Sequence, residues 1–472
     1  MLFSSVSFLL FFLPSLLAVY FCVPRRFRTV RNLVLLIFSL FFYGCGGVRF
    51  LLLMLASIMI NYIGGMLASL KNKRGAKWGM IAAVVCNLLL LGYFKYMGFF
   101  TQTLHSFIPS VEVVNVVLPI GISFYTFQGL AYVVDVYRGD TRVQKNPLWV
   151  ALYISLFPQL IAGPIVRYQT IADEIKGRRE NMEDFSAGCV RFMIGFGKKM
   201  LLANAAGRLA DIAFGFPSEH MSVSFAWMGA LAYTAQIYFD FSAYSDMAIG
   251  MGRMFGFHFL ENFNYPYISK SVTEFWRRWH ISLSSWFRDY VYIPLGGNRC
   301  SVPRHMLNIM IVWFLTGMWH GASWNFIIWG LYFGIILLIE KYLIAGVLNR
   351  IPSIIRHIYT MVLVVISWVI FRSEDLSAVW TYLGAMFGIG AEGFWSKQTV
   401  YYFIQFYPEW ILFFICSTPV AMVVGKYLTT KKNFFSGFVL NFVPKIFAVA
   451  VFILGYIELV NGSFNPFIYF RF

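Results

Sequence analysis

A single histidine lies inside a long apolar stretch of this chain. His320 belongs to the segment LTGMWHGASWNFIIWG, and the apolar run around it extends from Met306 to Ile339. As one helix this run would be about 51 Å long, whereas the hydrocarbon core of a bilayer is about 30 Å thick. The run must therefore break or fold back, and Gly317 and Gly321 give the backbone freedom for a break beside the histidine.

The depth of His320 makes it a candidate for chemistry. A helix that starts at Met306 would place the ring about 21 Å along its axis. An ionisable side chain inside a membrane is costly and often functional, whereas the structural alternative is a neutral histidine hydrogen-bonded between helices. A buried, neutral imidazole can accept a proton as a general base. Trp319 and Asn325, in the same segment, are predicted to line the cavity around it.

The second candidate, His280, lies in the segment EFWRRWHISLSSWFRDYVYIPLGGNR, residues 274–299. Tryptophans and arginines alternate around it, at Trp276, Arg277, Arg278, Trp279, Trp286 and Arg288. This pattern predicts an amphipathic helix at the membrane interface, where tryptophan is favoured and arginine meets headgroups. His280, Ser284 and Arg288 fall on one face at i, i+4, i+8 spacing, which suits a polar ligand.

A third polar group lies in the apolar segment QIYFDFSAYSDMAIGMG. Asp240, Ser242 and Asp246 are predicted to line a cavity, where they form a proton or cation path or tie helices together through hydrogen bonds. The segments FPQLIAGPI and LPIGISFYTFQGL bring proline and glycine into apolar stretches. Such residues indicate irregular backbone beside a cavity.

Several kinds of soluble enzyme lose support because their motifs are missing. The chain has no G-x-x-x-x-G-K-[ST], no H-E-x-x-H and no G-x-S-x-G, which argues against a nucleotide phosphatase, a zinc protease and a serine hydrolase. Its six cysteines are all more than twenty residues apart, so neither a zinc site nor a redox pair is predicted. No metal site is expected.

The elements that position these residues must be membrane helices. The chain of 472 residues is 59% hydrophobic and only 12% charged, outside the range of soluble domains. The fold class is therefore an all-α polytopic membrane protein. The net charge of +17 would suggest nucleic acid in a soluble protein, but here the basic residues occupy short loops, as expected next to anionic lipids.

The apolar segments predict about eleven to thirteen transmembrane or re-entrant helices. They lie at 5–23, 32–46, 48–70, 79–99, 114–136, 148–166, 187–203, 224–251, 306–319, 322–340, 354–371, 400–424 and 436–459. Pro158 and Pro164 interrupt the sixth segment, and three basic residues decorate the seventh, so some segments are expected to be re-entrant or in-plane. Loops 24–31 and 71–77 carry four basic residues each, which predicts cytoplasmic loops and an external N-terminus.

Taken together, the motifs resemble the membrane-bound O-acyltransferase (MBOAT) family, and within it the bacterial branch of alginate and peptidoglycan O-acetyltransferases. The matching segments are RNLVLLIFSLFFYG, GISFYTFQGLAYVVDVYRG, FPQLIAGPIVRY, DFSAYSDMAIG, FWRRWHISLSSWFRDYVYIPLGGNR, MWHGASWNF and the closing NPFIYFRF. They follow the family order over nearly the whole chain. The D-alanyl transfer protein for teichoic acid is a more distant relative with the same core.

The resemblance implies one domain over residues 1–472, with N-terminal helices in 1–136, a catalytic core in about 147–340 and C-terminal helices in 354–472. It implies an MBOAT helical basin in the bacterial cytoplasmic membrane, where a cytoplasmic acyl donor meets an external acceptor. His320 corresponds to the catalytic histidine of the family, and His280 to the second one. The expected donor is acetyl-CoA or an acyl carrier thioester, and no bound cofactor is expected. The expected partners are a polysaccharide, a secreted or membrane-anchored acetyltransferase, or both, with membrane lipids and no nucleic acid.

The donor would need contacts for its phosphates. Trp276, Arg277, Arg278 and Arg288 are predicted to bind the phosphates of CoA or phosphopantetheine, because arginine makes bidentate phosphate contacts. Headgroup anchoring is the alternative for these residues. For the whole chain, the alternatives are a transporter or flippase of a lipid-linked or acyl substrate, and D-alanyl transfer to teichoic acid.

Overall fold

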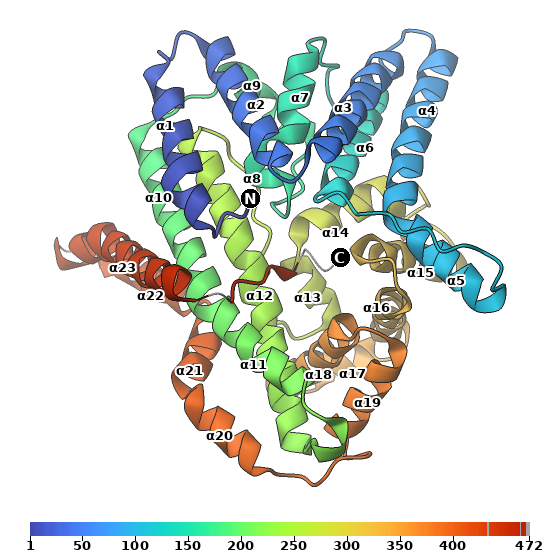
Figure 1. Ribbon diagram of the computed structural model, residues 1–472, viewed down its shortest axis with the longest axis vertical. Helices are drawn as coiled ribbons and strands as arrows, with labels where there is room; N and C mark the ends of the chain where they lie inside the picture. The colour runs from blue at the N-terminus through green and yellow to red at the C-terminus, as the bar shows by residue number, and fades with distance from the viewer. Residues whose placement is uncertain (432–433, 463, 469–472) are drawn as a thin grey trace. The chain divides into compact units, whose positions relative to one another are not determined.

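The computed structural model of the protein is helical (Figure 1). The structure describes residues 1–431, 434–462 and 464–468, and within these residues there are no β-strands. This agrees with the all-α class predicted from composition.

The helices form two compact units. The first comprises Met1–Phe192 and Tyr244–Leu260, and the second comprises Met193–Ala243 and Glu261–Phe472. One long helix, α12 (Val223–Met254), belongs to both units.

The first unit begins with α1 and α2 and continues with a group of three helices, α3, α4 and α6, that pack on one another. Its helices are η1 (Phe8–Phe12), α1 (Leu13–Cys22), α2 (Arg28–Gly44), α3 (Val48–Ala68), α4 (Lys73–Leu91), η2 (Gly92–Tyr96), α5 (Met97–Phe107), α6 (Ile122–Arg138), α7 (Pro147–Ser155), α8 (Phe157–Leu160), α9 (Tyr168–Gly177) and most of α10 (Met182–Gly197). Asn61 of α3 and Asn87 of α4 exchange side-chain amide hydrogen bonds of 3.1 and 3.0 Å. This reciprocal pair satisfies polar groups that apolar surroundings would otherwise leave unpaired.

A cluster of charged residues is buried around Glu180 in the first unit. Its carboxylate contacts the guanidinium groups of Arg28 and Arg31, and Tyr20 donates its hydroxyl hydrogen to the same carboxylate. Arg178 lies 3.7 Å away and donates to Tyr20 through Nη2 at 2.9 Å. Two of the four arginines in loop 24–31 are therefore held by an acidic residue about 150 positions further along the chain.

The second unit holds both candidate histidines. Its helices are η3 (Lys198–Ala203), α11 (Asn204–Phe214), η4 (Ser218–His220), η5 (Pro266–Ile268), α13 (Val272–Arg278), α14 (Ile281–Phe287), η6 (Arg288–Tyr292), α15 (Val302–His320), α16 (Trp324–Tyr342), α17 (Ala345–Arg350), α18 (Ser353–Arg372), α19 (Leu376–Met386), α20 (Lys397–Gln405), α21 (Tyr407–Cys416), α22 (Val420–Lys431) and α23 (Phe434–Asn461). Helices α15 and α16 pack along each other as a hairpin.

Several predicted boundaries move where proline or glycine intervenes. The helix predicted for 114–136 begins only at Ile122, because Pro119 has no N–H to donate and Gly121 adopts a φ of 78°. The segment predicted for 400–424 is divided among α20, α21 and α22, with Pro408 at the start of α21 and Pro419 before α22. Helices α9 and α19 were not among the predicted segments.

Fewer helices meet the length and hydropathy of a simple span than the eleven to thirteen segments predicted as transmembrane or re-entrant. Among the described residues five helices do so, and six if the bent pair α21 and α22 counts as one. The five are Val48–Ala68, Lys73–Phe107, Trp324–Tyr342, Ser353–Arg372 and Val439–Asn461. The other apolar segments are too short, too polar or too broken to pass as single spans.

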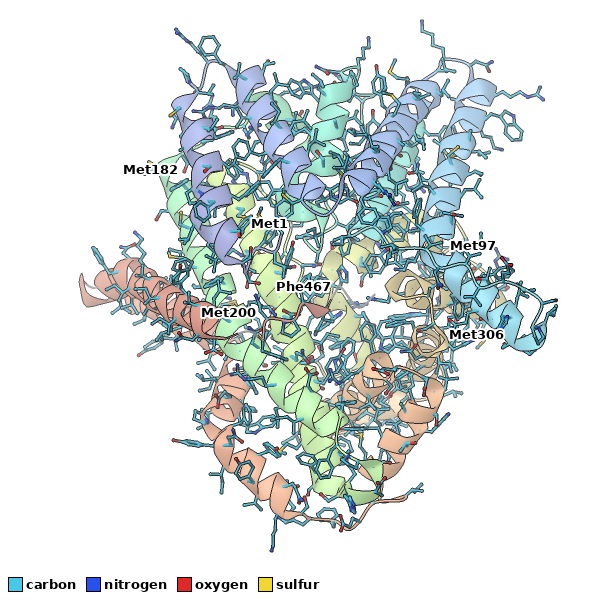
Figure 2. The ribbon with its side chains drawn as sticks, viewed as in Figure 1. Met1, Met97, Met182, Met200, Met306 and Phe467 are labelled. Atoms are coloured by element: carbon cyan, nitrogen blue, oxygen red, sulfur yellow. The ribbon has the colours of Figure 1, made fainter. Side chains whose placement is uncertain are left out.

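The segment after α23 returns to the interior of the second unit, where Figure 2 labels Phe467. Lys199 Nζ lies 2.8 Å from Asp240 Oδ1, and the backbone N–H of Ile468 donates to Asp240 Oδ2 at 2.9 Å. The buried ion pair therefore holds the backbone at Ile468. The last four residues of the predicted motif NPFIYFRF, 469–472, lie outside the described residues.

Candidate active site

The segment around His280 is two helices with a break, and the prediction of one amphipathic helix is wrong. Helix α13 ends at Arg278, α14 begins at Ile281, and His280 between them has a φ of 45°. Few residues other than glycine adopt this left-handed conformation, so it costs free energy that neighbouring contacts must offset. The i, i+4 spacing survives after the break, since Ser284 N–H donates to His280 O at 3.1 Å.

The three tryptophans of this segment do not lie on an exposed interfacial face. Trp276, Trp279 and Trp286 are all buried within the protein. Trp279, for example, packs against Trp368 at a ring distance of 4.9 Å. Packing against other aromatic side chains, rather than anchoring among headgroups, is what these rings do.

Asn262 holds the break in place. Its backbone O accepts the N–H of Ile281 at 3.0 Å. Its side-chain Oδ1 accepts both the backbone N–H and the hydroxyl of Ser282, at 3.2 and 2.9 Å, and lies 3.2 Å from His280 Nδ1. These contacts fix the left-handed residue between two helices.

The same contacts identify the tautomer of His280. A backbone N–H can only donate, so the atom of Asn262 that receives the N–H of Ser282 is the oxygen. His280 Nδ1 faces that oxygen and must carry the hydrogen. In the neutral ring Nε2 then bears the lone pair, and within the described part of the chain it has no hydrogen-bond partner. His280 is fully buried, so this lone pair is directed into the protein.

His320 is the last residue of α15, where the long apolar run breaks as predicted. Gly321 is extended, and residues 321–323 join α15 to α16. The two helices approach so closely that a Cβ on Gly330 would lie 2.3 Å from Trp313 O. Only glycine fits such an approach, which fixes the hairpin and so the place of the histidine.

Aromatic rings surround both histidines. Trp319 contacts both imidazoles, with ring distances of 5.9 Å to His280 and 5.0 Å to His320. Trp329 and Phe371 pack edge-on against His320 at 4.9 and 5.3 Å. The two histidines therefore contact the same indole and are both buried among aromatic rings.

A cavity of about 250 Å³ lies beside this aromatic group. It is lined by Thr273, Trp276, Arg277, Leu283, Ser284, Phe287, Arg288, Tyr292, Val312, Trp313, Thr316 and Leu337. The ring of Trp276 links the cavity to the histidines, because it contacts Trp329 at 5.7 Å. Sites for whole drug-sized ligands measure about 300–1,000 Å³, so this cavity suits a narrow arm of a larger molecule.

Four of the predicted donor and cavity residues therefore share one cavity: Trp276, Arg277, Ser284 and Arg288. Arg278 does not line it; its guanidinium donates to Glu274 at 2.9 Å and to Asn264 O at 3.1 Å. Trp276 is buried, and no described residue accepts from its Nε1. A buried indole N–H usually has an acceptor, and a carbonyl oxygen of a ligand would supply one.

The remaining predicted residues make polar contacts within their own units. Asp240 pairs with Lys199, as described above, and Ser242 accepts from Lys198 at 3.4 Å. Asp246, in the first unit, pairs with Arg191 at 2.9 Å. Asn325 donates to Ser373 O at 2.7 Å in the first turn of α16. For these four residues a place in the cavity stays a prediction.

Sequence reasoning missed three residues of the site: Asn262, Trp329 and Phe371. Asn262 stands in a polar loop and has no local signal, since its partner lies eighteen positions away. Trp329 belongs to the segment that was singled out, but an indole in an apolar helix is usually core. Across the described ranges no cluster of three or more histidine, cysteine or acidic side chains could hold a metal ion.

Comparison with known proteins connects this site to named relatives. The model of the membrane-bound O-acyltransferase family matches residues 141–373, which include both histidines, Asn262 and the whole cavity lining. The chain is 46% identical to the probable alginate O-acetylase AlgI of Pseudomonas aeruginosa, over 83% of this chain and 75% of that protein. It is 32% identical to the peptidoglycan O-acetyltransferase of Helicobacter pylori, over 100% and 98%. Similarity to the teichoic acid D-alanyltransferase of Bacillus subtilis is 30% over 58% of this chain.

Proposed function

The chain belongs to the membrane-bound O-acyltransferase family, and from this premise we propose that it passes an acetyl group from a cytoplasmic thioester to an acceptor on the outer side of the membrane. The observation that carries the proposal is His320, buried at the end of α15 and joined through Trp329 and Trp276 to a cavity with two arginines. A base, an apolar enclosure and a polar entry for a thioester are the parts that acyl transfer needs.

The narrow pantetheine arm of the donor enters the cavity. Arg277 and Arg288 are exposed and receive the phosphates of acetyl-CoA or of a phosphopantetheine carrier. The arm lies against Trp276, whose Nε1 donates to one of its carbonyl groups. The acetyl group then reaches His320 beyond the ring of Trp329.

His320 acts as the general base in direct transfer. Its imidazole takes the proton of the acceptor hydroxyl as the hydroxyl oxygen bonds to the thioester carbonyl carbon. The tetrahedral intermediate collapses, the carbon–sulfur bond breaks, and the leaving thiolate takes the proton back from the imidazolium. No covalent enzyme intermediate is needed if donor and acceptor meet directly.

The acceptor is an extracytoplasmic polysaccharide, or a partner enzyme that delivers the acetyl group to one. The relatives named for alginate and peptidoglycan O-acetylation support this class of acceptor. The relative named for D-alanyl transfer matches less of the chain, so acetyl transfer is the stronger proposal than transfer to teichoic acid or transport.

We place the protein in the bacterial cytoplasmic membrane with its N-terminus outside. Within the first unit, the α1–α2 and α3–α4 loops lie at the same end, as one cytoplasmic side requires (Figure 1). Cysteine introduced as Asn72→Cys, after replacement of the six native cysteines, should react with an impermeant reagent only in permeabilised cells. Labelling in intact cells would reverse the orientation.

The proposal is tested with purified protein in lipid vesicles. Radiolabelled acetyl-CoA and an acetylated carrier protein are offered in turn, with alginate or peptidoglycan fragments as acceptors. We expect labelled acceptor from at least one pair, loss of labelling in His320→Ala, and normal labelling in His357→Ala, whose ring contacts Ser269 O and does not line the cavity. Wild-type activity in His320→Ala would overturn the mechanism.

A further inference from the structure

His280 offers a hydrogen-bonding atom that the described residues leave unused. Asn262 fixes the ring as the tautomer with hydrogen on Nδ1, and the lone pair of the fully buried Nε2 has no partner there. A buried polar atom without a partner costs about 1–3 kcal/mol, so its retention in this site points to a ligand that supplies the partner. The ligand group must donate a hydrogen, because Nε2 can only accept.

Within the proposed reaction few groups can supply that hydrogen. The acceptor hydroxyl has one proton, which passes to His320. The thioester and its acetyl group have none to donate. Both candidate donors, however, carry an amide N–H two methylene groups from the reacting sulfur, in the arm that acetyl-CoA and phosphopantetheine share.

We propose that His280 binds this amide N–H through Nε2, and that Asn262 is the positioning residue that fixes the tautomer for this contact. The inference rests on the proposed function and names a contact within it. His280 therefore binds the acyl donor, and the reaction needs no base besides His320. The imidazoles of His280 and His320 both contact the ring of Trp319. One donor arm can therefore place its thioester near His320 and its amide, two methylene groups from the sulfur, near His280.

The backbone around His280 joins this contact to the cavity. Ser284, in the cavity wall, donates its backbone N–H to His280 O, and Trp276, in the same wall, lies in α13, which ends at Arg278 just before the break. His280 is not among the residues that line the cavity, so the proposed contact requires the donor arm to extend beyond it, past Trp276 and Ser284, to reach Nε2. Along that arm, Trp276 Nε1 offers a hydrogen to a carbonyl oxygen, and His280 Nε2 accepts an amide hydrogen. In one contact the protein donates a hydrogen and in the other it accepts one, which matches the C=O and N–H groups of the amides in one arm.

The test compares two small donors, acetyl-pantetheine and its analogue with an ester in place of the amide nearest the sulfur. The analogue keeps the carbonyl oxygen and lacks only the N–H. Wild-type protein should use it with kcat/KM lower on the order of 10- to 100-fold, because Nε2 is left without a partner. Asn262→Ala frees the ring to take the other tautomer, so this variant should use both donors almost equally.

His280→Gly gives a second variant, since glycine accepts the left-handed backbone without strain. It should also lose the discrimination between the two donors. Asn308→Ala is the matched control: Asn308 is a buried asparagine whose amide donates to Gly297 O, and this variant should discriminate as wild type does.

The outcomes separate this inference from the proposed function. Equal use of both donors by wild type, or full discrimination in both Asn262→Ala and His280→Gly, would overturn the contact while transfer itself continues. If wild type transferred acetyl from neither donor nor from acetyl-CoA and acetylated carrier, the proposed function would fail instead. A loss in His280→Gly as complete as that in His320→Ala would make His280 part of the proton transfer and would also overturn the inference.

Discussion

Two regions of the chain bury polar side chains in opposite ways. In the first unit the carboxylate of Glu180 is shared by Arg28, Arg31 and the hydroxyl of Tyr20. In the second unit His280 has one ring nitrogen bound to Asn262 and the other without a partner among the described residues. In the first region the protein itself supplies the partners of the buried polar groups, whereas in the second region one buried hydrogen-bonding atom remains for a ligand.

The difference predicts which measurement each region controls. Removing a member of a satisfied charge cluster strands its partners and lowers the free energy of unfolding. Removing a neutral ring from an aromatic site leaves no charge without a partner, so the main effect should be a lower rate of transfer. Activity and stability should therefore respond separately to changes in the two regions.

The largest expected effect is on catalysis, in His320→Ala. Loss of a general base removes about 3 to 5 kcal/mol of transition-state stabilisation, a drop of two to four orders of magnitude in kcat. The melting temperature should change far less than the rate, since the substitution removes packing against Trp319, Trp329 and Phe371 but strands no charge. Transfer rates and melting curves of the same purified sample check both halves. A variant that is inactive because it has unfolded would contradict the comparison.

The second effect is on stability, in Glu180→Gln. Three arginines would lose their buried counter-charge, at a cost of about 3 kcal/mol in the free energy of unfolding. The rate per folded molecule should not change. Thermal unfolding followed by tryptophan fluorescence, with a transfer assay on the folded fraction, gives both values. Normal stability with lost transfer would show that the cluster belongs to the reaction.

A smaller effect is expected on donor binding, in Arg288→Gln. This exposed arginine lines the cavity, and its loss should raise the KM for acetyl-CoA on the order of 5- to 10-fold while kcat is retained. Arg278→Gln is the matched control: each arginine pairs with one carboxylate, Arg288 with Asp289 and Arg278 with Glu274, but Arg278 does not line the cavity. An equal rise in KM in both variants would indicate a general effect of positive charge.

The smallest effect is on pH dependence. Burial would raise the pKa of Glu180, but hydrogen bonds from Arg28 and Tyr20 outweigh it and hold the pKa at about 2, below the ordinary 4.5. A lowered pKa contributes stability above the unfolded value, so the contribution is lost as pH falls from 4.5 through 2. The gap in melting temperature between wild type and Glu180→Gln should narrow over this range. A constant gap would mean that Glu180 does not titrate there.

The sequence predicted the parts of the site that local patterns encode. The break beside His320 followed from the length of the apolar run and its flanking glycines. Trp276, Arg277, Arg278 and Arg288 were grouped because arginine favours phosphate; all of them except Arg278 line one cavity. The all-α membrane class followed from composition and from the length of the apolar segments.

Long-range contacts could not be predicted in the same way. The break at His280 carries no glycine, and Asn262, which stabilises it, lies on a different segment. Glu180 is brought to Arg28 across about 150 residues by the packing of the first unit. Trp276 is buried because its ring packs against Trp313 of α15 and Trp329 of α16. Helical periodicity carries no information on these long-range contacts, so the sequence assigned Trp276 to the membrane interface.

One element of the first unit links the protein to the thickness of its bilayer. Lys73–Phe107 is a helical run of 35 residues, which corresponds to about 50 Å along its axis. A hydrocarbon core of about 30 Å cannot contain it upright and straight. The run turns at η2, where α5 leaves the direction of α4 (Figure 1), and it can also tilt, reach into the headgroups or locally thicken the bilayer. Each response costs a fraction of a kcal/mol per ångström of mismatch. The length of the surrounding lipid chains therefore sets the hydrophobic mismatch of this helix, and its tilt should differ between vesicles of short-chain and long-chain lipids.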